Sequence, residues 1–438
     1  MWKKASLVLA AVGVAATAAL FGGVLRGSPA GGSFTRPEPA TAARLVAGFA
    51  PPGNTEAYVA ELEQRVAGNA RDPQGLMLLG LAYQQRARET GDPSYYPRSE
   101  EALRRSLALA PKNYLAITGL AALAASRHRF EDARSLAQQA VRLNPLSAEA
   151  YGVLGDSLVE LGRYREAFMR FDRMASLKPA LASYSRVSYA RELLGRPRAA
   201  IASMKLAVEA GAGTAEPSAW SLVQLGNLYF DTGRLNLATR SYREALVHFP
   251  GYVHAQAALG KVAAARGRWD EAVRLYGRAV AKLPLPRYEA SLGDVLRLAG
   301  RLADAQSAYA VVAATEKLLR ANGVRTELET ALFDLDHGRD IAGALARARD
   351  AYRERKSIDG EDVLAWALYK NGRCGEALAH SRRALRLGTH DGLKIFHRGM
   401  IELCLGHGRE GRASLRRALR LNPHFSLLYV TVAEKALR

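Results

Sequence analysis

Apolar and polar positions along residues 148–179 follow the spacing of two amphipathic helices. The small residues Gly155 and Ala167 stand among large ones, which are Tyr151, Leu154, Leu158, Tyr164, Phe171 and Leu177. Two closely crossing helices need small residues where their backbones touch and large residues where a gap must be filled. The pattern therefore predicts a helical hairpin with its turn at Gly162-Arg163, ended by Pro179 because proline cannot continue a helix.

The same pattern returns when the sequence is shifted by about 34 residues, the period of one helix-turn-helix unit. One further copy is carried by Leu225-Gly226, Tyr229, Gly233, Ala238, Tyr242, Ala245 and Pro250, and another by Leu259-Gly260, Gly267, Ala272, Tyr276, Ala279 and Pro284. In a more degenerate copy Ser188-Tyr189 stands where Leu-Gly is expected. A fixed period of this length predicts hairpins that stack on their neighbours.

These residues resemble the signature of the tetratricopeptide repeat (TPR) family, in which Leu-Gly, a small residue, an aromatic residue and a closing proline recur in one frame. The resemblance implies an all-α, right-handed superhelical solenoid of TPR hairpins, about ten of them and some degenerate. It also implies a non-catalytic scaffold that binds a protein or peptide partner, similar to exported or membrane-anchored bacterial proteins of this family.

The beginning of the chain predicts targeting to the cell envelope. Lys3-Lys4 precedes an uncharged run from Ala5 to Leu25, so residues 1–26 are expected to be a signal peptide or an N-terminal membrane anchor. If the segment is retained, residues 5–25 would contact the membrane and the array would lie outside, in a single-pass arrangement. The alternative is secretion after cleavage near Ser28-Pro29-Ala30.

The remainder divides into three segments. Residues 27–54 are rich in glycine and proline and read as a flexible linker. Residues 55–323 are expected to form an N-terminal TPR array that begins with a single covering helix. The repeat pattern weakens from Val324, so residues 324–438 are expected to form a degenerate C-terminal array that ends in a capping helix.

The two cysteines of the chain, Cys374 and Cys404, fall in neighbouring repeats. Their spacing fits no metal site. We expect two buried thiols, and one disulfide is the alternative if the protein is exported.

Motifs that would support catalysis are missing from the sequence. It contains no H-E-x-x-H, no G-x-x-x-x-G-K-[ST], no G-x-S-x-G and no C-x-x-C motif. The run His337-Gly338-Arg339-Asp340 falls at a predicted turn between helices, and His397 beside Phe396 reads as a core or interface residue. We therefore expect neither an enzyme nor a cofactor.

The binding surface follows from the geometry of such an array, in which the first helix of each hairpin lines the concave groove. Amide and charged groups there suit the backbone of an extended peptide, while Tyr189 and Phe230 offer apolar contact. The residues predicted to line this groove are Asp156, Tyr189, Asn227, Phe230, Asp231, Lys261, Asp294 and Arg297.

The 438 residues carry a formal net charge of +20, which raises the question of an anionic partner. Six arginines occupy equivalent places in the last two clear repeats and are predicted to form a basic patch on one convex face: Arg382, Arg383, Arg386, Arg416, Arg417 and Arg420. The simpler interpretation is a solvated surface. The alternative is a site for an anionic polymer or a membrane surface, whereas nucleic acid is not the expected partner.

Overall fold

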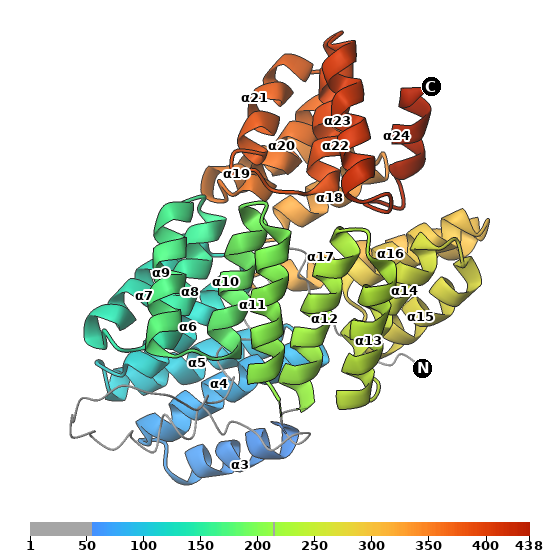
Figure 1. Ribbon diagram of the computed structural model, residues 1–438. Coiled ribbons are helices and arrows are strands. Elements are labelled where there is room, and N and C mark those ends of the chain that lie inside the picture. The colour runs from blue at the N-terminus through green and yellow to red at the C-terminus, as the bar shows by residue number, and fades with distance from the viewer. Residues whose placement is uncertain (1–54, 213–214) are drawn as a thin grey trace.

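The computed structural model of the chain describes residues 55–212 and 215–438 (Figure 1). This part contains 22 helices and no strand. The predicted signal or anchor at 1–26 and the linker at 27–54 lie outside the described residues. The helices are α3 (Thr55–Gly68), α4 (Pro73–Thr90), α5 (Tyr95–Leu109), α6 (Tyr114–Ser126), α7 (Phe130–Leu143), α8 (Ala148–Glu160), α9 (Tyr164–Leu177), α10 (Leu181–Leu193), α11 (Pro197–Ala210), α12 (Ala215–Asp231), α13 (Leu235–His248), α14 (Val253–Ala265), α15 (Trp269–Lys282), α16 (Pro286–Leu298), α17 (Leu302–Ala321), α18 (Glu327–Asp336), α19 (Ile341–Glu354), α20 (Ile358–Lys370), α21 (Cys374–Ala384), α22 (Gly392–Cys404), α23 (Gly408–Leu421) and α24 (Val430–Leu437).

Helices α4 to α23 pair in sequence order as ten hairpins, and α3 and α24 are single helices at the two ends. Each hairpin also packs on the next, with first helix against first helix along most of the array. The expectation of an all-α solenoid of about ten hairpins is therefore confirmed.

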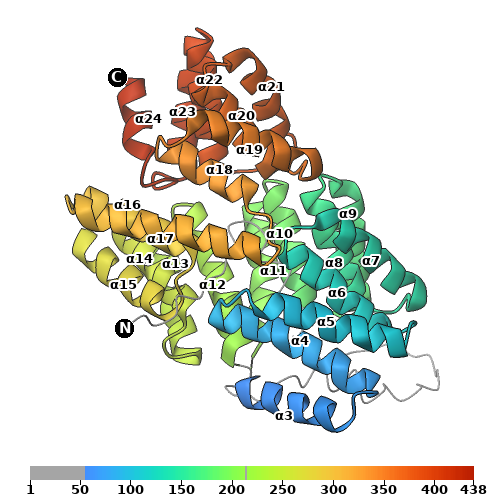
Figure 2. The same cartoon turned by 180° about the vertical axis from the view of Figure 1, so that it is seen from behind.

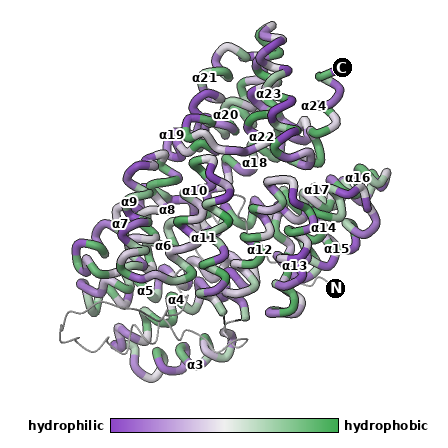
Figure 3. Tube along the Cα trace, in the orientation of Figure 1, coloured by the Kyte–Doolittle hydropathy of each residue, from purple (hydrophilic) through white to green (hydrophobic). Residues whose placement is uncertain are grey.

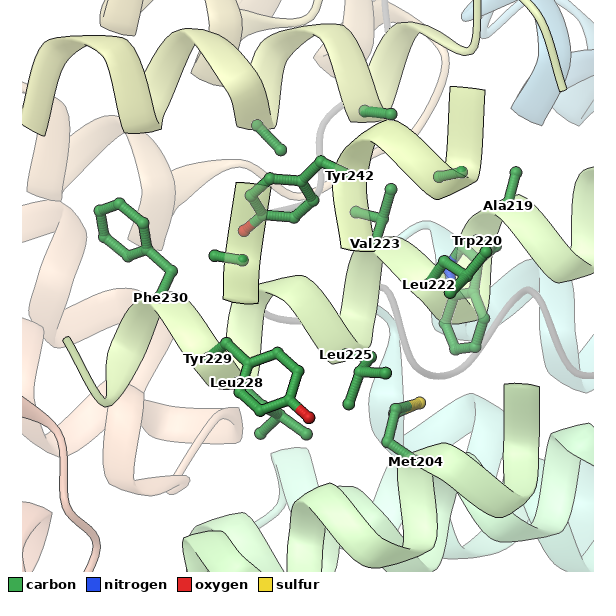
Figure 4. Packing of buried hydrophobic residues seen from close by; sticks show 14 of the residues in the cluster. Met204, Ala219, Trp220, Leu222, Val223, Leu225, Leu228, Tyr229, Phe230 and Tyr242 are labelled. Atoms are coloured by element: carbon green, nitrogen blue, oxygen red, sulfur yellow. The ribbon is translucent and has the colours of Figure 1, made fainter. Parts of the chain in front are cut away.

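A glycine in the first helix of a hairpin packs against a large side chain in the second. A Cβ atom on Gly155 would lie 2.4 Å from Phe171 Cε1, and one on Gly226 would lie 2.3 Å from Tyr242 Cε1. Both aromatic rings are buried, and Figure 4 shows Tyr242 in the cluster with Val223 and Trp220. Only glycine lets the two helices approach this closely, so a Leu-Gly pair marks the crossing point in the hairpins that carry one.

The degenerate hairpin α10–α11 keeps this arrangement with a shift of register. Helix α10 begins at Leu181, 33 residues after α8 begins at Ala148, so Ser188 alone takes the place of the glycine. The Ser188 hydroxyl donates to the carbonyl oxygen of Ala200 at 2.8 Å and is fully buried. This corrects the alignment of Ser188-Tyr189 with Leu-Gly by one position.

Cys374 begins α21 and Cys404 ends α22, and the two are joined in a disulfide with a Cα–Cα distance of 6.3 Å. Successive antiparallel helices bring the start of one beside the end of the next, so a separation of 30 residues becomes a contact. The expectation of two buried thiols is wrong, and the disulfide alternative holds.

After α17 the array returns to meet its own beginning. In Figures 1 and 2 the hairpins α18–α23 lie beside the ends of α8–α11. The Arg325 amide donates to the Arg127 carbonyl oxygen at 3.1 Å, and the Ile358 amide donates to the Tyr164 hydroxyl at 2.6 Å. We call this self-contact the seam. It is formed by the turns within the hairpins α6–α13 on one side and by the loops between the hairpins α16–α23, together with the segment after α23, on the other.

A buried ion cluster lies in the seam. Arg355, at the end of α19, donates from Nε and Nη2 to Glu160 Oε2 at 3.2 and 3.1 Å, and from Nη1 to Glu329 Oε1 at 2.7 Å. All three side chains are at least 90% buried. Because an unpaired buried charge is very costly, the two parts of the chain are held in one register here.

Hydrophobic and hydrophilic positions are interspersed along the whole array (Figure 3). Between residues 55 and 212 and between 215 and 438, no helix has both the length and the apolarity needed to span a bilayer. The predicted membrane segment, residues 5–25, is not among the residues described.

We predict that Phe171→Ala lowers the free energy of unfolding by about 3–5 kcal/mol, because it empties the crossing of the α8–α9 hairpin. Met169→Ala in the same helix is the control. Its side chain is 57% exposed, so a change within about 0.5 kcal/mol is expected. Urea titration followed by circular dichroism measures both, and equal losses would contradict the packing described.

We further predict that the double variant Cys374→Ser, Cys404→Ser is less stable than the oxidised protein by about 2–4 kcal/mol, because the cross-link restricts the unfolded chain. A reductant should lower the urea midpoint of the wild type to that of the variant and leave the variant unchanged. Since the chain has only two cysteines, thiol titration of the unreduced protein should find none free. A full count of two thiols would refute the disulfide.

Candidate protein-binding surface

Four successive first helices, α10, α12, α14 and α16, line a cavity of about 630 Å³ on the inner side of the array, which we call the chamber. Its opposite wall comes from the other side of the seam, from residues 358–359 and 389–394 together with Asn422 and Phe425. The concave surface is thus covered in part by the chain itself.

Side chains of the chamber wall come from equivalent positions in successive repeats. Asp156, Tyr189, Asn227, Lys261 and Asp294 all follow the small residue at the crossing point of their hairpin, so they occupy one equivalent position in five successive first helices. Of the eight predicted groove residues, the structure brings four together around the chamber: Tyr189, Asn227, Asp231 and Lys261.

These side chains are held by neighbours. Asn227 Oδ1 accepts a hydrogen bond from the Tyr242 hydroxyl at 2.9 Å. Lys261 Nζ lies 3.6 Å from Asp231 Oδ1 and 3.9 Å from the centre of the Phe230 ring. Both contacts hold the Lys261 ammonium group between α14 and the end of α12, where it can also contact a ligand.

The structure corrects two of the predicted placements. Asp156 is buried, and Arg186 Nε and Nη2 donate to its carboxylate at 2.6–3.0 Å. Phe230 is 2% exposed and lies beneath Lys261 rather than in the chamber. A buried charge needs a buried partner, so Asp156 serves the packing of α8 on α10.

Asp294 and Arg297 of α16 also lie outside the chamber wall, and Arg297 is exposed. Asp294 Oδ1 accepts from the Tyr309 hydroxyl and from His337 Nε2, both at 2.8 Å. His337 directly follows α18, so this contact joins α16 to the end of α18, near the place where the repeat pattern of the sequence weakens. Asp294 is thus a structural residue of the junction.

His337 prefers its charged form. Its Nδ1 lies 2.7 Å from the Phe333 carbonyl oxygen and its Nε2 faces Asp294, so both nitrogens meet acceptors and both must donate. Burial disfavours the imidazolium, but the hydrogen bond and the charge of Asp294 outweigh burial and raise the pKa of His337 above its usual value.

Sequence reasoning missed further chamber residues. Glu192 lies three residues after Tyr189 on the same helix face, a signal that was available in the sequence. Burial, together with the nearby carboxylates Asp231 and Asp391, raises the pKa of Glu192 to about 8. Asp391 and Lys394 come from the opposite wall, about 200 residues further along the chain, and no local pattern could have placed them there.

Two of the six arginines in the predicted basic patch are engaged by neighbouring groups. Arg383 Nε donates to Glu361 Oε1 at 2.8 Å. Arg386 Nη2 donates to the Lys356 carbonyl oxygen at 3.0 Å, and its guanidinium lies over the Tyr164 ring across the seam. All six arginines of the patch are exposed, and the four not engaged in these contacts are Arg382, Arg416, Arg417 and Arg420.

His397 is a core residue, as expected. It is fully buried, its ring stacks on Trp366 with a centroid distance of 4.1 Å, and its Nδ1 lies 3.0 Å from Asp362 Oδ2. In the part of the chain that the structure describes, no three His, Cys, Asp or Glu side chains are grouped so that they could hold a metal ion.

We predict that His337→Asn lowers the free energy of unfolding by about 1.5–3 kcal/mol at pH 6, the value of a hydrogen bond to a charged group. Because the pKa of His337 is raised in the folded state, its contribution is fully present below about pH 6.5 and is lost as pH rises through the folded-state pKa. The difference between wild type and variant in urea titrations should therefore shrink toward alkaline pH. A constant difference would contradict this assignment.

The chain is similar to known proteins in sequence pattern and in structure. The tetratricopeptide repeat pattern matches residues 118–182, 223–289 and 259–317. No curated protein matches the chain in sequence.

Among solved structures, a thermophilic TPR protein of Thermus thermophilus, TTC0263, is 21% identical with a TM-score of 0.38, and the match covers 46% of this chain and 100% of that one. The type IV pilus biogenesis factor PilW is 16% identical with a TM-score of 0.39, over 48% and 97%. YrrB, a TPR protein with an unusual peptide-binding site, is 20% identical with a TM-score of 0.29, over 42% and 93%. The chain thus carries tetratricopeptide repeats at residues 118–182 and 223–317, within an array of ten helical hairpins.

Proposed function

We propose that this protein is a non-catalytic scaffold that binds an extended segment of a partner protein in the chamber on its inner surface. The observation that carries the proposal is the wall of the chamber. Four successive first helices line it, and three of them present Tyr189, Asn227, Asp231 and Lys261 together on one concave face. Apolar and polar groups converging in a concave site are what a peptide segment requires.

The size of the chamber suits a short segment. Its wall follows α12 from Trp220 to Asp231, which spans about 16 Å at a rise of about 1.5 Å per residue. An extended peptide advances about 3.3–3.6 Å per residue, so four or five residues would fill this length. Trp220 and Met204 would meet apolar side chains at one end, and Glu192 and Asp231 would meet polar or basic groups at the other.

We also propose that the protein works at the cell envelope, with the array outside the membrane. Two observations support this location. Lys3-Lys4 followed by the uncharged run at residues 5–25 has the character of an export signal or anchor. The disulfide between Cys374 and Cys404 is of a kind that persists mainly in oxidising compartments. Secretion after cleavage is the other form of the same proposal.

A second candidate function is binding of an anionic polymer or membrane surface. It is favoured by the six exposed arginines of the patch, four of which lie on α21 and α23 outside the contacts that Arg383 and Arg386 make with Glu361 and the seam. Such binding depends on counterion release, so it weakens steeply as salt is raised.

Peptides selected by the full-length protein from a random peptide library provide the test. We predict that the double variant Tyr189→Ala, Asp231→Ala binds the selected peptides at least tenfold more weakly in calorimetric titration, because both side chains line the chamber. The matched control, Asp270→Ala with Arg274→Ala, changes two exposed residues of α15 and should bind within twofold of wild type.

Two outcomes would remove the proposal. One is equal affinity of the chamber variant and the control. The other is binding that falls steeply between 50 and 200 mM salt and is lost in Arg416→Gln, Arg417→Gln, which would favour the anionic surface instead (about 10²-fold for four contacts).

A further inference from the structure

The wall opposite α10 and α12 is held differently from the rest of the seam. Near α6 and α8 the seam is fastened by polar contacts, namely the Arg325–Arg127 and Ile358–Tyr164 hydrogen bonds and the Arg355 ion cluster. Between the turns after α10 and α12 and the loops facing them, no hydrogen bond or ion pair joins the residues described. The seam therefore has a fastened side and an unfastened edge.

The unfastened edge closes through glycine. Gly195, in the turn after α10, has φ of +64°, and a Cβ atom there would lie 2.1 Å from the Gly388 carbonyl oxygen and 3.2 Å from His390 Cδ2. Further along, a Cβ atom on Gly233 would lie 3.4 Å from Pro423 Cδ, an ordinary van der Waals distance. Apolar packing and shape, rather than hydrogen bonds, thus keep this edge shut: Leu387 packs on the cluster that contains Leu193 of α10. A single added methyl group at Gly195 would force the edge apart.

The same segment that touches Gly195 covers the chamber. Residues 389–394 form its opposite wall, directly after Gly388. Within the segment, Asp391 accepts from the amides of Leu393 and Lys394, and the Lys394 ammonium pairs with Asp391 and with Asp359 at 2.7 Å. We call residues 388–394 the cover. These contacts attach the cover to α20 and α22, so it moves with the C-terminal hairpins rather than as a free loop.

We propose that the seam is the gate of the chamber: it opens at the edge formed by α10 and α12, turns about the fastened side at α6 and α8, and lifts residues 388–394 from the site. This inference rests on the proposed function, because it regulates entry to the same chamber. Residues 388–394 cover the chamber in part, so lifting them widens the access of an extended segment to Tyr189 and Asn227.

The test uses one engineered thiol in the chamber. Ser291 lines it and is half-buried, and the native cysteines are joined, so Ser291→Cys provides the single thiol of the described chain. The probe is a maleimide-capped pentaglycine peptide, and mass spectrometry measures its rate of attachment in the full-length protein. We expect Gly195→Ala to raise this rate at least tenfold.

Gly300→Ala is the matched control. Gly300 occupies the equivalent turn of the α16–α17 hairpin with φ of +79°, but a Cβ atom there would meet nothing within 4 Å. Both variants carry the strain of a side chain at positive φ. Only the methyl group of Gly195→Ala would push the turn after α10 away from Gly388. Equal labelling rates in two variants with matching circular dichroism spectra would overturn the proposal.

Hydrogen exchange at the fastened side gives a second measurement. The Arg325 and Ile358 amides donate across the fastened side, so an opening at the other edge leaves both bonds in place. Their exchange rates in Gly195→Ala should stay within twofold of those in Gly300→Ala, and a tenfold rise would refute a gate that turns about the fastened side.

The labelling assay is separate from peptide selection, so the two proposals fail in different ways. Faster labelling in Gly195→Ala with no peptide selected would support the gate and remove the proposed function. Selected peptides whose association rate is the same in Gly195→Ala and Gly300→Ala would keep the binding site and remove the gate.

Discussion

Close approach of two helices at a small residue is the constraint on which this molecule depends. At Gly155 and Gly226 the space of a missing Cβ atom is filled by an aromatic ring of the partner helix, and the ring is buried by that contact. Neither helix of a hairpin could bury its apolar face alone, so each hairpin stabilises the next and the array grows in one direction. The residue that follows each small position then faces the inner surface, which is why the chamber wall repeats with the hairpins.

Because the array curves, it meets itself after a little less than two hundred residues. Arg355 and Glu160, which share a buried ion pair, are 195 positions apart in sequence. This self-contact changes what the inner surface is. An open groove becomes a chamber with two walls, and the second wall carries charged groups of its own, Asp391 and Lys394. Polar fastening on one side of the seam and glycine contact on the other give the two walls unequal freedom to separate.

The register of the repeat also explains which polar residues are available to a ligand. Asp156, Tyr189, Asn227, Lys261 and Asp294 hold equivalent positions, yet Asp156 is neutralised by Arg186 and Asp294 is engaged by His337. The three positions between them are those that line the chamber. Equivalent residues therefore divide into structural and accessible ones according to what the neighbouring hairpin supplies.

Local sequence patterns were enough to predict the hairpins, most of their crossing points, the approximate number of repeats and four residues of α10, α12 and α14 that line the chamber. These features follow from contacts within about 34 residues, where side-chain size and helical period leave a direct pattern. Contacts between distant segments could be read only from the folded chain: Cys374 meets Cys404, Glu192 and Asp391 share a cavity, and Arg386 packs on Tyr164 rather than facing a ligand. The curvature that brings the two sides of the seam together accumulates from small rotations over many hairpins, and no single repeat records it.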